Sequence, residues 1–147
     1  MDDLLGKPAA SPSSAIGKPL IHILTCLYPL AFFSKGSPTL YDFLERESVT
    51  ATHFVVGAHV RTNPDLFLTA FSTLGDDIAV HTYTHPYMTS LSNDAVFAEL
   101  VYTMQIIYNC TGGRVAKYWR PPYGDSDRRV QGIANCLNLT TILWNHE

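Results

Sequence analysis

The chain has 147 residues, a formal net charge of -3, 46% hydrophobic residues and 16% charged residues. This length suits one domain with a buried core, and the apolar composition excludes a chain that is disordered throughout. The ten basic residues are scattered along the sequence, so we expect no nucleic-acid partner. The three cysteines, Cys26, Cys110 and Cys136, allow at most one internal disulfide, whose pairing the sequence does not decide.

The first 36 residues differ in character from the rest of the chain. Residues 1–19 are rich in Ala, Ser, Pro and Gly without periodicity, which predicts a flexible, partly disordered leader. Residues 20–33 form an apolar run of 14 residues, which is too short for a bilayer, so we expect no membrane span. This run starts late and lacks a clear cleavage site, so it makes no convincing signal peptide. It is interpreted as a buried strand or as a segment foreign to the domain.

Helices and strands alternate from residue 37 onward. Ser37-Pro38 is typical of a helix start, and the apolar spacing that follows predicts a short helix ending near Arg46. Residues 49–57 are rich in β-branched and aromatic side chains and predict a buried strand that ends at glycine. Asn63-Pro64 then predicts the start of a second helix, which Gly75 ends.

The next predicted strand, residues 78–82, carries His81 at its C-terminal end, with His85 just beyond. A third helix is predicted to begin at Ser92-Asn93 and to end at Gly112-Gly113. A short strand at residues 117–119 follows and runs directly into the segment R-P-P-Y-G.

The last predicted elements are a helix capped by Ser126 or Asp127 that runs to Asn138, and a strand at residues 140–144. Strands that alternate with helices imply right-handed βαβ crossovers and a parallel sheet or barrel. Ligands bind at the carboxyl ends of the strands in such folds. Because the histidine pair and the R-P-P-Y-G segment both follow strands, the sequence predicts one shared site.

His81 and His85 stand four residues apart in V-H-T-Y-T-H-P. Two neutral imidazoles this close can bind one transition-metal ion, since each ring offers a lone pair. Catalytic zinc takes three protein ligands and a water, so the pair needs at least one further donor. The alternative interpretation is two ordinary histidines of a loop or of the core.

Three segments together carry a family resemblance: A-T-H-F-V-V-G at residues 51–57, H-T-Y-T-H-P at residues 81–86 and W-R-P-P-Y-G-D at residues 119–125. With them the chain resembles the polysaccharide deacetylases of carbohydrate esterase family 4, the NodB-homology domain, and within them fungal chitin deacetylases. The resemblance implies an α/β fold, a distorted (β/α) barrel with parallel strands. The implied reaction is metal-dependent hydrolysis of N-acetyl groups on chitin-like polymers of N-acetylglucosamine.

The resemblance also implies the roles of individual residues. His81 and His85 match the ligands of a divalent metal, zinc or cobalt. Arg120 matches the residue that orients the catalytic aspartate, with a surface salt bridge as the alternative. Tyr123 matches the residue whose backbone N–H faces the oxyanion. The expected substrate contacts are Pro122, Trp119 and Tyr87. For the family we expect a chitin-like partner, a secreted or cell-wall location and a monomer.

The sequence departs from the family pattern at both ends. The first motif, a T-F-D-D-G-like block, should lie shortly before Ser37, but residues 21–34 contain no acidic residue. The catalytic base and the third metal ligand are therefore expected to be missing, which leaves the ligand set incomplete. The sequence stops after Trp144-Asn145-His146-Glu147, before the Leu-x-His block that would supply the general acid.

Other acidic residues make poor replacements. Asp77 shares strand parity with His81, but four residues of strand span about 13 Å, which is too far for one ion. Asp76 is expected to point the other way, and Asp125 to cap or hydrate the arginine loop.

Two functions remain open. Residues 37–147 are predicted to be a truncated deacetylase domain with impaired activity, after an atypical segment at residues 1–36. The alternative is a non-catalytic relative that binds carbohydrate.

Overall fold

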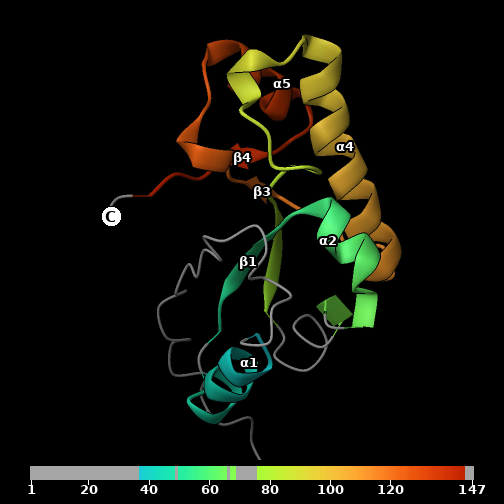
Figure 1. Ribbon diagram of the computed structural model, residues 1–147, viewed down its shortest axis with the longest axis vertical. Coiled ribbons are helices and arrows are strands. Elements are labelled where there is room, and N and C mark those ends of the chain that lie inside the picture. Colours follow the sequence, from blue (N-terminus) through green and yellow to red (C-terminus); the bar gives the residue numbers. More distant parts are fainter. Residues whose placement is uncertain (1–36, 49, 66, 69–75, 145–147) are drawn as a thin grey trace, which may run out of the picture.

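The computed structural model describes residues 37–48, 50–65, 67–68 and 76–144, and four parallel strands in this part form one sheet (Figure 1). The spatial order is β1-β2-β3-β4, which is also the order along the chain. The strands are Thr52–Val55 (β1), Asp77–Val80 (β2), Tyr118–Trp119 (β3) and Thr140–Thr141 (β4). The predicted parallel α/β fold is confirmed, and over the described residues the sheet does not close into a barrel.

The register of the sheet brings the predicted site segments to one edge. Val55 pairs with Val80, and Val80 pairs with Trp119, so β1, β2 and β3 end at the same level. His81 and Arg120 are the residues that follow β2 and β3. Because parallel strands expose their carboxyl ends together, both side chains begin at the same edge of the sheet.

The helices are α1 (Ser37–Arg46), α2 (Gly57–Thr62), α4 (Asn93–Cys110) and α5 (Arg128–Cys136). Two short 3-10 helices, Met88–Ser90 (η1) and Pro122–Gly124 (η2), lie in the loops after β2 and β3. Residues 64–65 and 67–68 are helical, in agreement with a helix start near Asn63-Pro64, and the rest of that predicted helix lies outside the described residues. The predicted leader and apolar run at residues 1–36 also lie outside them.

The third and fourth predicted helices, observed as α4 and α5, begin where the sequence indicated. The Ser92 hydroxyl accepts a hydrogen bond from the Ala95 amide at the start of α4. The Asp127 carboxylate accepts one from the Val130 amide at the start of α5, 2.8 Å away. These side chains satisfy amides that have no partner within the helix, which explains why the capping residues were readable from the sequence.

Helix α2 was not predicted, because the sequence indicated a break between Gly57 and the next helix. Its first two amides, of Gly57 and Ala58, donate to the carbonyls of Thr82 and Tyr83, both at 3.0 Å. A Cβ on Gly57 would lie 2.7 Å from the Tyr83 ring and 2.8 Å from the Thr103 hydroxyl. Glycine therefore permits the close approach of α2 to α4 and to the loop after β2.

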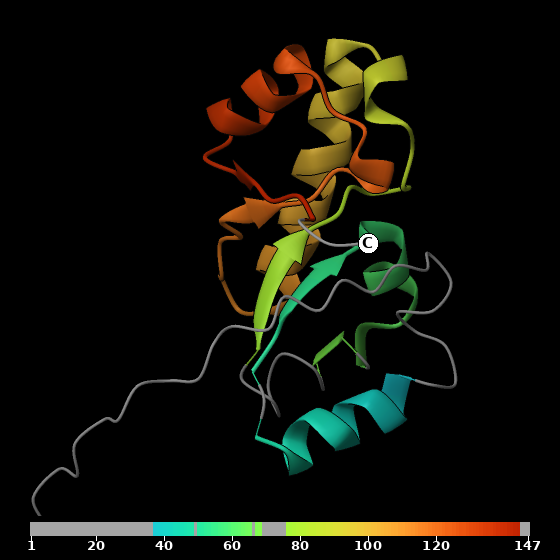
Figure 2. The ribbon, with the colours of Figure 1, turned by 90° about the vertical axis from the view of Figure 1, so that its left-hand side faces the viewer.

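The core fills the space between the sheet and the helices. Helix α4 contacts β2, α2 and α5, and Figure 2 shows it running behind the strands. The core contains Val55, Val60, Val80, Met88, Val96, Leu100, Ile107, Trp119, Val130 and Leu139. In the described part of the chain, no helix has both the length and the apolar character needed to cross a membrane.

Candidate active site

The two histidines of the predicted metal pair face each other at the end of β2. Their ring centroids lie 4.9 Å apart with the ring planes at 74°. His81 Nδ1 lies 2.7 Å from the carbonyl oxygen of Arg120, and only a protonated nitrogen can donate to a carbonyl. The hydrogen bond therefore holds the His81 tautomer that leaves the lone pair on Nε2, the atom free to bind a metal.

Burial keeps both rings in the neutral form that binds metals. Desolvation lowers the pKa of His81 to about 4, although its hydrogen bond to the Arg120 carbonyl acts in the opposite direction. The nearby charges of His85 and Arg120 lower it further. Desolvation also lowers the pKa of His85, with a smaller contribution from His59. The Nδ1 atom of His85 is buried and has no hydrogen-bond partner among the described residues.

Arg120 is a core residue, with a relative exposure of 2%. Its guanidinium lies over the rings of Phe54, at 4.1 Å, and Trp144, at 5.4 Å. Its Nε donates to the carbonyl of Ile142 at 3.4 Å. Burial lowers the pKa of the guanidinium. Because Arg120 is 2% exposed, the alternative of a surface salt bridge does not fit its position.

One guanidinium nitrogen of Arg120, Nη1, is buried without a hydrogen-bond partner among the described residues. Leaving such a donor unsatisfied costs about 1–3 kcal/mol, and more when the group is charged. A carboxylate is the acceptor that matches a guanidinium best. This nitrogen is therefore a donor that a carboxylate would satisfy.

Tyr123 stands beside the histidine pair, on the loop after β3. Its ring lies 4.8 Å from the His85 ring and stacks on the Tyr87 ring at 4.2 Å. Both tyrosines are more than half exposed. The Tyr123 backbone adopts a left-handed conformation with φ 59°, directly after the buried Pro121 and Pro122. Among the described residues its amide N–H makes no hydrogen bond and is available to a ligand.

Two of the predicted substrate contacts lie in the interior. Trp119 is fully buried, and its indole N–H donates to the Thr141 hydroxyl at 2.8 Å. Its side chain does not reach the surface, so the expected contact between Trp119 and substrate is corrected to a core position. Pro122 is also buried, and its role stays a prediction. Tyr87 is the expected contact that is exposed beside the site.

The described residues do not complete a metal site. They contain no group of three His, Cys, Asp or Glu side chains that could hold one ion. The acidic residues considered as replacements are engaged elsewhere: Asp76 with His53, Asp77 with Arg114, and Asp125 with Thr89. The residues present thus supply two ligands, and this set alone does not fit a tightly bound catalytic ion.

No pattern in the sequence indicates that Glu99, in the middle of α4, reaches the loop of the histidine pair. Its carboxylate accepts hydrogen bonds from the amides of Tyr83 and Thr84 and from the Thr84 hydroxyl. An acidic residue on a predicted helix is ordinarily interpreted as part of its solvated face. Only the tertiary fold brings Glu99 to the histidine loop.

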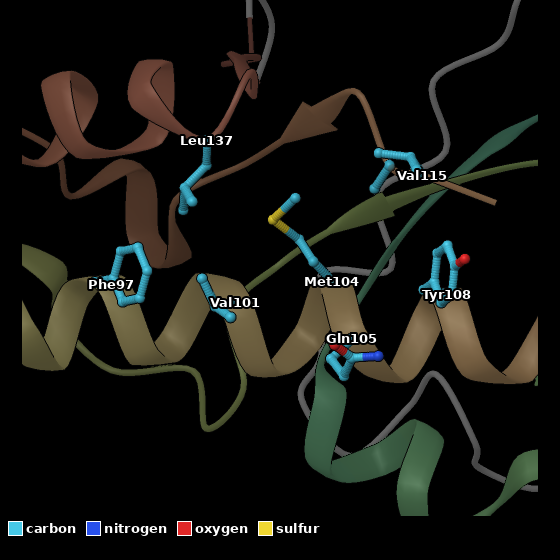
Figure 3. A pocket seen from close by; sticks show the side chains of 8 residues that line it. Phe97, Val101, Met104, Gln105, Tyr108, Val115 and Leu137 are labelled. Carbon is cyan, nitrogen blue, oxygen red and sulfur yellow. The ribbon is translucent and has the colours of Figure 1, made fainter. Parts of the chain in front are cut away.

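An apolar groove of about 380 Å³ runs along α4 from Phe97 to Tyr108 (Figure 3). Phe97 and Met104 of α4 extend toward Leu137, and Tyr108 extends toward Val115. None of the predicted site residues lines this groove, so it is separate from the histidine pair.

Comparisons with known proteins identify the family of the chain. The family model described as polysaccharide deacetylase matches residues 28–142. Chitin deacetylase 3 of Cryptococcus neoformans var. neoformans is 47% identical over 114 residues, which cover 76% of this chain and 28% of that protein. The chain thus spans less than a third of the length of this relative.

Solved structures of the same class share the fold. A family 4 carbohydrate esterase from Streptomyces lividans in complex with acetate has a TM-score of 0.71 and 31% identity, covering 76% of this chain and 57% of that one. A family 4 pseudoenzyme from Bacillus anthracis has a TM-score of 0.68 and 29% identity, covering 73% of this chain and 37% of that one. The family model matches well over half of the sequence, and the chain therefore belongs to the polysaccharide deacetylase family.

Proposed function

We propose that the chain carries the site of a polysaccharide deacetylase that acts on N-acetyl groups of chitin-like N-acetylglucosamine polymers. The observation that carries this proposal is the convergence of His81, His85, Arg120 and Tyr123 at the carboxyl ends of β2 and β3. The similarity to chitin deacetylase 3 supports the choice of polymer.

His81 and His85 are proposed to hold two positions of a divalent ion, zinc or cobalt. Such an ion, when bound, polarises a carbonyl and lowers the pKa of a water molecule. Since the described residues supply no third ligand, we propose that this chain binds the ion weakly and that its turnover is impaired. The absence of any acid in residues 21–34 supports this view.

The remaining side chains are proposed to position substrate and a carboxylate. The unpartnered Nη1 of Arg120 would hold the carboxylate that acts as general base. The free N–H of Tyr123 would donate to the oxyanion that develops on the acetyl carbonyl. The stacked rings of Tyr87 and Tyr123 would contact a sugar ring at the rim, because aromatic faces suit apolar sugar faces.

At the level of the whole chain, we propose a deacetylase domain at residues 37–147 preceded by an atypical segment. We also propose that the chain is a monomer and that it is secreted or located in the cell wall. Similarity to fungal chitin deacetylases supports the location.

A second candidate is a non-catalytic relative that binds chitin-like polymer through Tyr87 and Tyr123. The incomplete ligand set among the described residues favours it. One solved structure similar to this chain is a family 4 pseudoenzyme, so inactive members of this fold occur.

Acetate release separates the two candidates. The full chain is incubated with partially acetylated chitooligosaccharide and added Zn²⁺ or Co²⁺, and both acetate and bound oligosaccharide are measured. We expect binding together with slow acetate release that requires the added ion, because no general base stands among the described residues. Binding without any acetate release would support the non-catalytic candidate. Turnover that His81→Asn abolishes would exclude the non-catalytic candidate. If the chain shows no binding and no turnover, both candidates are wrong.

Zinc retention is a simpler test of the metal proposal than acetate release. After dialysis of the zinc-loaded chain against metal-free buffer, we expect weak or no retention, because two imidazoles are fewer ligands than tightly bound zinc uses. The measurement is the zinc-to-protein ratio, with His85→Ala as the control. Tight stoichiometric binding lost in that variant would show a third ligand outside the described residues.

A further inference from the structure

The turn that joins the two histidines adopts an unfavourable backbone conformation. Thr82 has φ 65° and His85 has φ 64°, both in the left-handed region. This region costs a non-glycine residue about 1–2 kcal/mol, and a β-branched residue such as Thr82 rarely adopts it. Such a conformation persists only where the surrounding structure holds it.

Two helices, α2 and α4, hold this turn. The Gly57 and Ala58 amides of α2 bind its carbonyls, at Thr82 and Tyr83. From α4, Glu99 Oε2 accepts the amides of Tyr83 and Thr84 at 2.7 and 2.8 Å.

The other oxygen of Glu99, Oε1, accepts the Thr84 hydroxyl at 2.6 Å. One carboxylate thus receives three charge-assisted hydrogen bonds from two consecutive residues of the turn. Other side chains also contact the turn: Arg61 Nη1 donates to the Tyr83 hydroxyl at 3.3 Å, and the Thr82 hydroxyl accepts the His85 amide at 3.1 Å. Glu99 is the side chain outside the turn that binds the backbone amides of Tyr83 and Thr84.

Helix α4 makes Glu99 a firm support. The next residue, Leu100, is fully buried, and the Thr103 hydroxyl bonds the Glu99 carbonyl at 3.0 Å. The helix spans 18 residues and packs on β2 and α2. Its position is therefore fixed independently of the turn it holds.

We propose that Glu99 is a positioning residue: through the turn at residues 82–84 it sets the His85 ring against the His81 ring. This proposal rests on the proposed metal role of the pair. It adds the side chain that fixes the position of one histidine ring relative to the other. Residues that orient metal ligands from outside the coordination sphere contribute about 10- to 100-fold to metal affinity.

The test uses Glu99→Gln in the full chain, with Asp94→Asn as the matched control. Both substitutions remove one negative charge from α4, but Asp94 is exposed in its first turn and makes no contact with the histidine turn. The readouts are amide hydrogen exchange at Tyr83 and Thr84, the NMR signals of the His85 ring, and affinity for Cu²⁺, the divalent ion that imidazoles bind most tightly.

We expect exchange at the two turn amides to become at least about tenfold faster in Glu99→Gln, since a hydrogen bond to a charged group is lost. The His85 ring signals are expected to shift, and Cu²⁺ affinity to fall about tenfold. Asp94→Asn is expected to match the wild type in all three. If Glu99→Gln behaves like Asp94→Asn in exchange and ring signals, the proposal is wrong.

A second pair of variants covers the case in which Glu99→Gln does not fold. Thr84→Val removes one of the three hydrogen bonds and keeps the charge, whereas Thr84→Ser keeps the hydroxyl. The valine variant is expected to shift the His85 signals and the serine variant to restore them. Equal signals in both would overturn the proposal.

The copper measurement separates this inference from the proposed function. If His81→Asn binds Cu²⁺ as tightly as the wild type, the metal role of the pair is wrong. The exchange rates and ring signals still decide whether Glu99 positions the turn.

Discussion

Replacing Asp76 by alanine is expected to lower the free energy of unfolding by about 3 kcal/mol or more. Asp76 is fully buried at the start of β2, where its Oδ2 lies 2.6 Å from His53 Nε2 and its Oδ1 accepts the Ala51 amide at 2.9 Å. The substitution removes the acceptor of two buried donors at once. Urea unfolding followed by circular dichroism measures the loss.

The adjacent residue provides a matched control. Asp77 forms an ion pair of similar length with Arg114, but both side chains are more than two-fifths exposed. An exposed pair contributes about 0–1 kcal/mol, because water screens it and both side chains lose freedom. Asp77→Ala is therefore expected to cost less than about 1 kcal/mol. Equal losses in the two variants would show that burial of the Asp76 pair does not stabilise the sheet.

The location of this pair separates stability from function within the sheet. Asp76 lies before β2, at the amino end of the strands, whereas His81 follows the carboxyl end. In parallel folds the carboxyl ends carry the chemistry and the opposite ends carry packing. Asp76→Ala is therefore expected to act on folding, without direct contact to the histidine pair.

The site segments could be predicted because their signals are local. An apolar run that ends in His81, and a short strand followed by Arg120, place both at the carboxyl ends of strands once the fold is parallel. The same reasoning misplaced Trp119, because its position next to the arginine loop does not reveal on which side of the sheet it packs. Strand alternation correctly predicted that the Asp76 side chain does not point towards His81, and it contacts His53 instead.

The contacts that hold the loop after β2 could not be predicted, because they join residues that are far apart in the sequence. Helix α2 begins at Gly57 because its first amides find carbonyls in the loop after β2. Glu99 reaches the same loop from a helix that begins after η1. Neither partner is near in sequence, so neither periodicity nor capping signals could identify these contacts.

Acidification is expected to destabilise the fold through His81. Burial lowers its pKa from 6.5 to about 4, so between these values the unfolded chain binds a proton that the folded chain does not. The free energy of unfolding rises with pH wherever the unfolded state binds more protons. The contribution of His81 is therefore complete above about pH 6.5 and is lost as the pH falls towards 4. At pH 5 the loss is about 2 kcal/mol relative to pH 7.

The control for this prediction is His81→Asn. The asparagine amide can donate to the Arg120 carbonyl as His81 Nδ1 does, but it does not titrate. Groups away from this pair titrate equally in both proteins, so the difference between the two urea-unfolding series at pH 7 and pH 5 reports His81 together with its coupling to His85. The wild type is expected to lose about 2 kcal/mol more than the variant over this range. Equal losses would mean that His81 accepts a proton as readily in the folded chain as in the unfolded chain, and the prediction would be wrong. The prediction rests on the burial of His81 beside the Arg120 guanidinium, which disfavours the protonated ring.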